Sequence, residues 1–260
     1  EGDLEAGERL LRKLWNASKL VHQLAPADVA APGRAVDAAD GGASEADGSP
    51  DLEPIDEWLL ARQDAVLASV TEKYREHEYA KARTELRTFF WETFCDDYLE
   101  IAKQRLDDAD REALADATAD AATRSAAYAL RTAHEQFCSL FAPILPHVTE
   151  EIWQAAYADG SDAQSIHATD WPEQTGQTAT LDAGETALTV ISALRRYKTD
   201  NGLPLNADLT AATVYGDVAG FEGAIADVMH VDEVTARAGD APTTTDFYVN
   251  DTSILNDRFT

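Results

Sequence analysis

Apolar side chains recur every three or four residues along most of this sequence, and no other feature constrains the fold as strongly. The segment 78–105 shows the pattern most clearly, because one helical face would carry Tyr79, Ala82, Leu86, Phe90, Phe94, Tyr98 and Ile101. Similar spacing predicts helices over 3–24, 55–76 and about 110–141. Long helices joined mostly by short connections predict a mainly α fold, an antiparallel helical bundle.

The pattern changes after Trp153. The residues predict a helix over about 184–200, a strand over 209–216, a short helix over 221–231 and a second strand over 232–239. We therefore expect a helical-bundle domain over 1–158. Residues 159–260 are expected to hold a linker, a helix and a small C-terminal α+β subdomain.

One segment of the predicted bundle domain does not fit a helix. Residues 26–54 are dominated by Ala, Gly, Asp, Ser and Pro, and their only basic residue is Arg34. Such a segment cannot bury enough apolar surface to order itself. We expect an acidic, flexible insert.

The stretch "LFAPILPHVTEEIWQ" (Leu140–Gln154) could be a paired-carboxylate site or a joint between helices. Pro143 should end one helix, and Pro146 suits the first turn of the next. Glu150 and Glu151 are adjacent, so on a helix they diverge by about 100° rather than facing one another. The sequence favours the joint.

The usual motifs of catalysis are missing from the sequence. It contains no GxGxxG, GxxxxGK[ST], HExxH or GxSxG pattern, and none of the six His residues has Glu three positions before it. A metal-dependent bundle enzyme is therefore disfavoured. Cys95 and Cys138 lie inside helical patterns without a CxxC motif, and we expect reduced thiols in the core. We predict no catalytic, cofactor-binding or metal-binding residue.

The charge balance is strongly acidic, with 48 Asp and Glu against 21 Lys and Arg, for a net charge of -27. The acids are spread along the chain, which favours the carboxylate-rich surface of a halophilic protein over an acidic interaction tail. No apolar run is long enough to cross a membrane. The sequence opens inside a helical pattern without Met, and we interpret it as part of a longer polypeptide.

Basic residues are unevenly placed. None occurs from Thr132 to Leu194, whereas they gather in the first helical segment, in the second and third, and again at 195–198. Ion pairs along exposed helices explain many such residues. A base beside an aromatic side chain, as at Arg87 and Trp91, also suits phosphate contact and base stacking.

Several segments resemble one known family in order and spacing. "RKLWNASKLV" (Arg12–Val21), "IDEWLLARQDAV" (Ile55–Val66), the Leu140–Gln154 stretch with "SIHATDWP" (Ser165–Pro172), and "ISALRRYKTDNGLPL" (Ile191–Leu205) are similar to the anticodon-binding domain of class I aminoacyl-tRNA synthetases of the valine, isoleucine and leucine group. "FFWETFCDDYLEIAKQRL" (Phe89–Leu106) resembles the valine branch. Asp97 departs from the family pattern, which has Trp there.

The resemblance implies a bundle that holds the anticodon stem-loop of tRNA(Val) in the cytoplasm. ATP with Mg would be used by a catalytic domain of the same polypeptide, which would also carry an editing domain. The residues that we expect to contact tRNA are Arg12, Lys13, Asn16, Lys19, Arg87, Trp91, Lys103, Arg195, Arg196 and Lys198. The alternative is an acidic helical protein-interaction module without RNA binding, in which the 26–54 insert engages a basic partner.

Overall fold

The computed structural model describes residues 2–26, 50–106, 113–114, 118–179 and 181–237. The chain divides into two compact units, Glu1–Gln177 and Thr178–Thr260. The boundary that we expected from the sequence, between 158 and 159, lies earlier than this division. Residues 27–49, most of the predicted insert, lie outside the described part of the chain.

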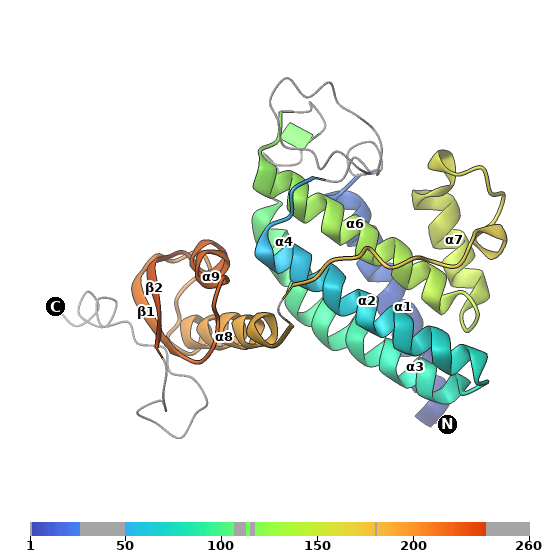
Figure 1. Ribbon diagram of the computed structural model, residues 1–260, viewed down its shortest axis with the longest axis horizontal. Coiled ribbons are helices and arrows are strands. Elements are labelled where there is room, and N and C mark those ends of the chain that lie inside the picture. Colours follow the sequence, from blue (N-terminus) through green and yellow to red (C-terminus); the bar gives the residue numbers. More distant parts are fainter. Residues whose placement is uncertain (1, 27–49, 107–112, 115–117, 180, 238–260) are drawn as a thin grey trace. The chain divides into compact units, whose positions relative to one another are not determined.

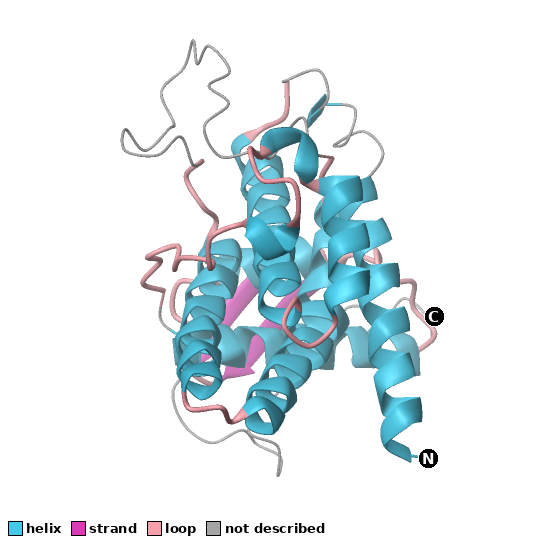
Figure 2. Ribbon diagram, turned by 90° about the vertical axis from the view of Figure 1, so that its right-hand side faces the viewer, coloured by secondary structure: helices cyan, strands magenta, loops and turns pink. Residues whose placement is uncertain are grey.

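The first unit is helical in the ranges described (Figures 1 and 2). Its elements are α1 (Gly2–Leu24), α2 (Pro54–Arg75), α3 (Tyr79–Thr88), the π-helix η1 (Phe89–Tyr98), α4 (Leu99–Arg105), α6 (Ala121–Phe141), α7 (Pro146–Ala156), and the short 3-10 turns η2 (Ala158–Gly160) and η3 (Ile166–Ala168). The predicted mainly helical class is confirmed.

Local sequence signals explain where α2, α6 and α7 begin. Pro54 and Pro146 begin α2 and α7, where the missing N–H costs little. Within the predicted helix over 110–141, α6 begins at Ala121, because Asp120 caps it and its side chain accepts from the Thr123 N–H at 2.8 Å. The segment predicted as 78–105 is continuous, but its middle ten residues form a π-helix.

The core of the first unit surrounds α6, which packs against α1, α2, α3, α4 and α7. Phe137 of α6 is fully buried, and its ring centroid lies 5.0 Å from that of Phe94 and 5.1 Å from that of Phe90. These aromatic pairs add specific geometry to the apolar area that they bury. Cys95 and Cys138 are buried free thiols, as predicted.

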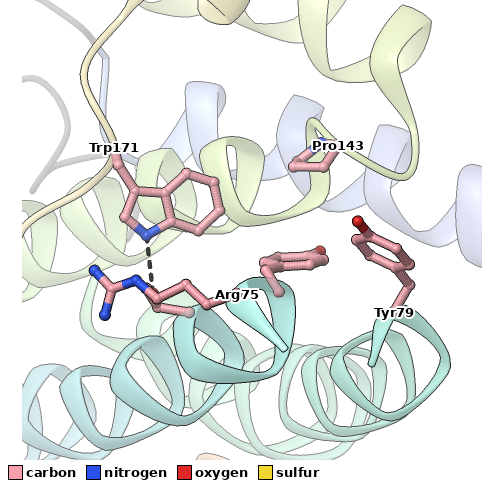
Figure 3. Close-up of a pocket in the computed structure, with 6 residues that line it drawn as sticks. Arg75, Tyr79, Pro143 and Trp171 are labelled. Carbon is pink, nitrogen blue, oxygen red and sulfur yellow. Dashed lines mark hydrogen bonds between the residues drawn. The ribbon is translucent and has the colours of Figure 1, made fainter. Parts of the chain in front are cut away.

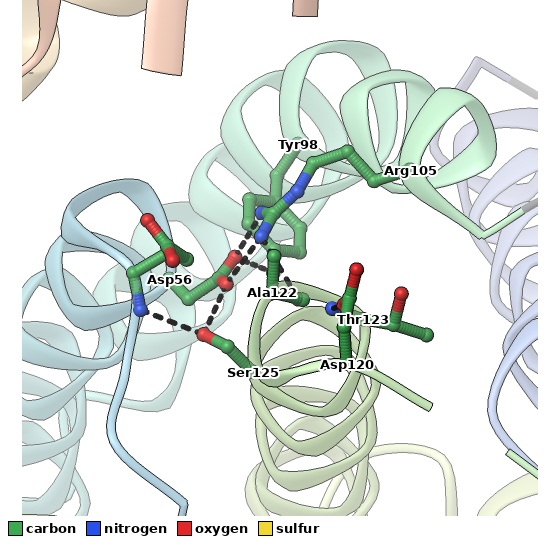
Figure 4. Close-up of polar contacts among 8 residues, drawn as sticks. Asp56, Tyr98, Arg105, Asp120, Ala122, Thr123 and Ser125 are labelled. Atoms are coloured by element: carbon green, nitrogen blue, oxygen red, sulfur yellow. Dashed lines mark hydrogen bonds and ion pairs between the residues drawn. The ribbon is translucent and has the colours of Figure 1, made fainter. Parts of the chain in front are cut away.

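A buried ion pair links four of these elements (Figure 4). The Asp56 carboxylate on α2 is fully buried and accepts two hydrogen bonds from the Arg105 guanidinium on α4, at 2.7 and 2.9 Å. Its oxygens also accept from the hydroxyls of Tyr98 on η1, at 2.6 Å, and Ser125 on α6. Ser125 in turn accepts from the backbone N–H of Glu53. The network satisfies the carboxylate completely.

A second buried polar group centres on His134 of α6. One ring nitrogen lies 2.8 Å from the Ser18 hydroxyl on α1, and the other lies 2.5 Å from the Tyr157 hydroxyl that follows α7. Burial, and then the nearby Arg131, lower the pKa of His134 to about 3. The imidazole is therefore neutral at pH 7 and ties α1, α6 and the end of α7 together through hydrogen bonds.

The stretch 140–154 is a joint, as predicted. Helix α6 ends at Phe141 and α7 begins at Pro146. The Glu150 carboxylate accepts from the Ser165 hydroxyl at 2.8 Å and from the Ile166 N–H at 3.1 Å. Hydrogen bonds from Gln154 first, and then from Ser165, hold the Glu150 pKa below its usual value. Glu150 therefore fastens the segment that follows α7 back onto that helix.

Residues 165–177, which we call the strap, return along the bundle. The Trp171 indole donates to the Thr71 hydroxyl at 2.8 Å, and the Gln136 amide donates to the Glu173 carbonyl at 2.9 Å. The buried Asp64 carboxylate accepts from the N–H groups of Thr175 and Gly176, both at 2.8 Å. These contacts explain why the first unit extends to Gln177.

The second unit contains α8 (Leu181–Asp200), β1 (Leu209–Tyr215), α9 (Glu222–Met229) and β2 (Val231–Arg237). The two strands pair in parallel, with Leu209 opposite Val231 and Val214 opposite Ala236. A parallel pair requires a crossover, which α9 supplies. The predicted small α+β subdomain is thereby confirmed in the described residues.

We expect Asp56→Asn to lower the free energy of unfolding by about 3 kcal/mol or more, because Arg105 would keep a buried charge without its counter-ion. Chemical denaturation at fixed KCl measures the change. Glu57→Gln is the matched control: it removes the same charge from the next residue, which is only half-buried, and should change stability by less than about 0.5 kcal/mol. Equal losses would contradict the importance of the pair.

We also expect His134 to make the bundle acid-sensitive. Its pKa is lowered from 6.5 to about 3, so below pH 6.5 the unfolded chain binds a proton that the folded chain excludes. Stability from this group is complete above pH 6.5 and falls toward pH 3 by up to about 1.4 kcal/mol per pH unit.

The test compares unfolding free energies of the wild type and His134→Gln between pH 5 and about pH 6.5, where ordinary carboxylates contribute little. The variant should show the flatter pH dependence. Burial raises the pKa of the neighbouring Glu135, but both proteins share that group. Parallel curves would show that His134 does not titrate with unfolding.

Candidate nucleic-acid interface

Two of the predicted contact residues meet in the first unit. The Lys13 ammonium on α1 lies 5.0 Å from the centroid of the Trp91 ring on η1 and 2.7 Å from a carboxylate oxygen of Asp96. The Lys13 side chain is 30% exposed and that of Asp96 is 51% exposed, so the group is open to solvent. An aromatic ring with a cation above it is a suitable surface for RNA, since bases stack on such rings and phosphates pair with the cation.

The π-helix explains how Trp91 and Asp96 reach the same lysine. Residues five apart would diverge by about 140° on an α-helix, which turns about 100° per residue. In a π-helix the hydrogen bonds join residues five apart, as from the Leu99 N–H to the Phe94 carbonyl here. Trp91 and Asp96 therefore lie closer to one face than they would on an α-helix, and both contact Lys13 of α1.

A second cation–aromatic pair lies on α1. The Lys19 ammonium is 5.2 Å from the centroid of the Trp15 ring, and Lys19 itself is exposed. Trp15 is not among the contact residues that the sequence led us to expect. Its spacing of four residues from Lys19 was the available signal, because side chains four apart are neighbours on a helix.

The other predicted residues of the first unit are exposed. Arg12 pairs with Glu8 at 2.5 Å and Lys103 pairs with Glu100, so both take part in ion pairs within their own helices. Such exposed pairs contribute little energy and can exchange partners readily. Asn16 lies exposed on α1, and Arg87 lies exposed in the last turn of α3.

The structure corrects the prediction for Lys198 in the second unit. Lys198 is 0% exposed, and its ammonium donates to the carbonyls of Leu205, Ala207 and Met229 at 2.8, 2.7 and 2.6 Å. Burial lowers its pKa, and Asp208 opposes that shift. The side chain joins α8, the turn after it and the end of α9, and it is not accessible at the surface.

The remaining basic residues of that helix differ from Lys198. Arg196 is exposed and its guanidinium lies 3.5 Å from the Asp200 carboxylate. Arg195 is half-buried. These two residues stay in the predicted set.

Sequence reasoning missed an aromatic pocket in the first unit (Figure 3). It has a volume of about 370 Å³ and is lined by Thr71, Tyr74, Arg75, Tyr79, Pro143 and Trp171. Tyr79 is 54% exposed and Trp171 39% exposed. The polar atoms of the three rings already have protein partners, because Tyr74 donates to the Leu140 carbonyl and Tyr79 lies 3.0 Å from His77. The pocket lies where the α2–α3 turn meets the strap. Helical periodicity does not reveal contacts between such segments.

Among the residues with described positions, no three His, Cys, Asp or Glu side chains gather in a way that could hold a metal ion. In the same part of the chain, no helix combines the length and the apolar character needed to span a membrane.

Comparison with known proteins gives a consistent result. Residues 56–213, more than half of the chain, match the family described as the anticodon-binding domain of tRNA ligase. The valine–tRNA ligase of Haloarcula marismortui is 54% identical over 231 residues, which cover 89% of this chain and 22% of that protein. The valine–tRNA ligase of Methanothermobacter thermautotrophicus is 31% identical over 249 residues, covering 91% of this chain and 24% of the relative.

The chain thus spans between a fifth and a quarter of the length of these curated relatives. The family match begins at Asp56, the acid of the buried network, and runs through the joint and the strap into β1. The elements that build the first unit from α2 onward are therefore those of the family. This chain belongs to the anticodon-binding domain family of tRNA ligases.

Proposed function

We propose that this chain is the tRNA-binding part of a valine–tRNA ligase and that it holds the anticodon stem-loop of tRNA(Val). The observation that carries the proposal is the Lys13–Trp91 pair, a cation and a ring that lie together at the surface of an anticodon-binding domain. Base stacking and a close phosphate contact are what such a pair provides. That both relatives are valine–tRNA ligases supports valine as the amino acid.

In this proposal the chain makes no bonds. A catalytic domain of the same polypeptide, with an editing domain, joins valine to tRNA with ATP and Mg in the cytoplasm. The bundle contributes position, because a tRNA held at its anticodon end presents its acceptor end at a fixed distance. The proposed contacts are Arg12, Lys13, Asn16, Lys19, Arg87, Trp91 and Lys103 in the first unit and Arg195 and Arg196 in the second, while Trp15 is added and Lys198 is left out.

Binding RNA with a net charge of -27 requires an explanation. At about 1 M salt the Debye length is about 3 Å, so distant carboxylates hardly repel the RNA. Counterion release also adds little affinity in concentrated salt. Stacking and short-range pairs must then supply most of the binding energy, and this favours the cation–aromatic pairs over isolated lysines.

We expect Trp91→Ala to weaken binding of the tRNA(Val) anticodon hairpin in high KCl by about fivefold or more, since one stacked base contributes about 1–3 kcal/mol. Lys81→Ala is the control: Lys81 is exposed on α3 and pairs with Glu78 at 2.5 Å. It should change the affinity by less than about twofold. Circular dichroism would confirm that both variants fold, and equal or reversed losses would contradict the role of Trp91.

The alternative function, an acidic protein-interaction module, depends on the 26–54 insert. Deleting residues 28–52 separates the two. We expect tRNA binding, measured by filter retention, to survive the deletion because the proposed contacts lie on the helices. Loss of tRNA binding by a folded deletion variant would contradict this assignment.

A further inference from the structure

We propose that Asp96 is an internal competitor of RNA for the Lys13–Trp91 pair, so that the affinity of this surface is set by the Lys13–Asp96 ion pair. The inference rests on the proposed RNA binding and deepens it. Asp96 is not among the contact residues that we expected from the sequence. In this proposal it adjusts the affinity of the Lys13–Trp91 surface for RNA according to the salt concentration.

The geometry indicates that Asp96 and a phosphate would compete directly for Lys13. A carboxylate oxygen of Asp96 lies 2.7 Å from the Lys13 ammonium, the distance at which a phosphate oxygen would also bind. A phosphate that reaches Lys13 must therefore approach a carboxylate of the same charge. Lys13 keeps free hydrogens for a second acceptor, but the repulsion between the two anions weakens that contact.

The contact depends on the local backbone. The π-helix brings residue 96 closer to the face of residue 91 than an α-helix would, and Asp96 and Trp91 both contact Lys13. Other acids of η1 differ in placement: Glu92 is exposed, and Asp97 is half-buried. Lys13 pairs with Asp96 on η1, whereas Arg12, one residue earlier, pairs with Glu8 on its own helix.

Salt determines how strongly Asp96 competes. The pair is partly exposed, so its attraction and its repulsion of phosphate are both screened as salt rises. In concentrated KCl the carboxylate would cost little, and Lys13 with Trp91 would be available to RNA. In dilute salt the carboxylate would hold the lysine and repel the backbone. As the salt concentration rises, this surface would therefore lose less affinity for RNA than a lysine without a neighbouring carboxylate.

The test is the affinity of the chain for a tRNA(Val) transcript. It is measured from the lowest KCl concentration that preserves the helical circular dichroism spectrum up to several molar. Asp96→Asn removes the charge and keeps an oxygen that can accept from Lys13. We expect it to tighten binding about threefold to fivefold at the low end, the effect of an exposed charge pair of up to about 1 kcal/mol. The advantage should shrink as KCl rises.

Glu92→Gln is the matched control, because it removes the same charge from an exposed residue of the same π-helix. We expect it to tighten binding by less than about half as much as Asp96→Asn does at low salt. A second experiment compares the Lys13→Met variant with the double variant that also carries Asp96→Asn. If Asp96 acts through the lysine, most of its effect disappears there.

The outcomes separate the two proposals. Equal effects of Asp96→Asn and Glu92→Gln, or an unchanged effect in the Lys13→Met background, would overturn the competition while leaving RNA binding intact. Failure of the folded wild-type chain to bind the transcript at any salt would overturn the proposed function and the competition together.

Discussion

The buried ion pair between Asp56 and Arg105 is the interaction on which the helical unit most depends. It joins the start of α2 to the end of α4, and the hydroxyls of Tyr98 and Ser125 bring η1 and α6 to the same carboxylate. Two charges taken out of water are costly unless every lone pair is satisfied, and here each Asp56 oxygen has donors. Because the network meets only when these four elements adopt one arrangement, it selects that arrangement over other packings of similar apolar helices.

The π-helix connects the core to the surface. Its buried side carries Phe90 and Phe94 into the aromatic group around Phe137, while its outer side presents Trp91 and Asp96 to Lys13. On an α-helix, Trp91 and Asp96 would diverge by about 140°. Widened turns of this kind are rare and occur frequently at functional sites. In this protein, the Trp91 ring and the Asp96 carboxylate both contact Lys13.

The sequence predicted the features that depend on neighbouring residues. Prolines and apolar spacing located α1, α2, α7 and the joint. The strand–helix–strand order of the second unit followed from stretches of strand-like and helix-like sequence that succeed one another. It could not predict the π-helix, because apolar residues spaced by four fit α and π turns alike. It also could not predict that Lys198 is buried, since that depends on carbonyls of the turn and α9 that no periodicity places together. The Tyr74–Trp171 pocket depends on long-range contacts in the same way.

The strap has a consequence for the order in which the chain folds. Its anchors, Asp64 on α2 and Gln136 on α6, are 111 and 37 residues away from their partners Thr175 and Glu173. Helical turns close within a few residues and form quickly, whereas contacts between remote positions must first overcome the entropy of closing the loop. The strap can dock only on a surface that α2 and α6 have already made. The bundle should therefore assemble first, and the strap should be among its last segments to come to rest.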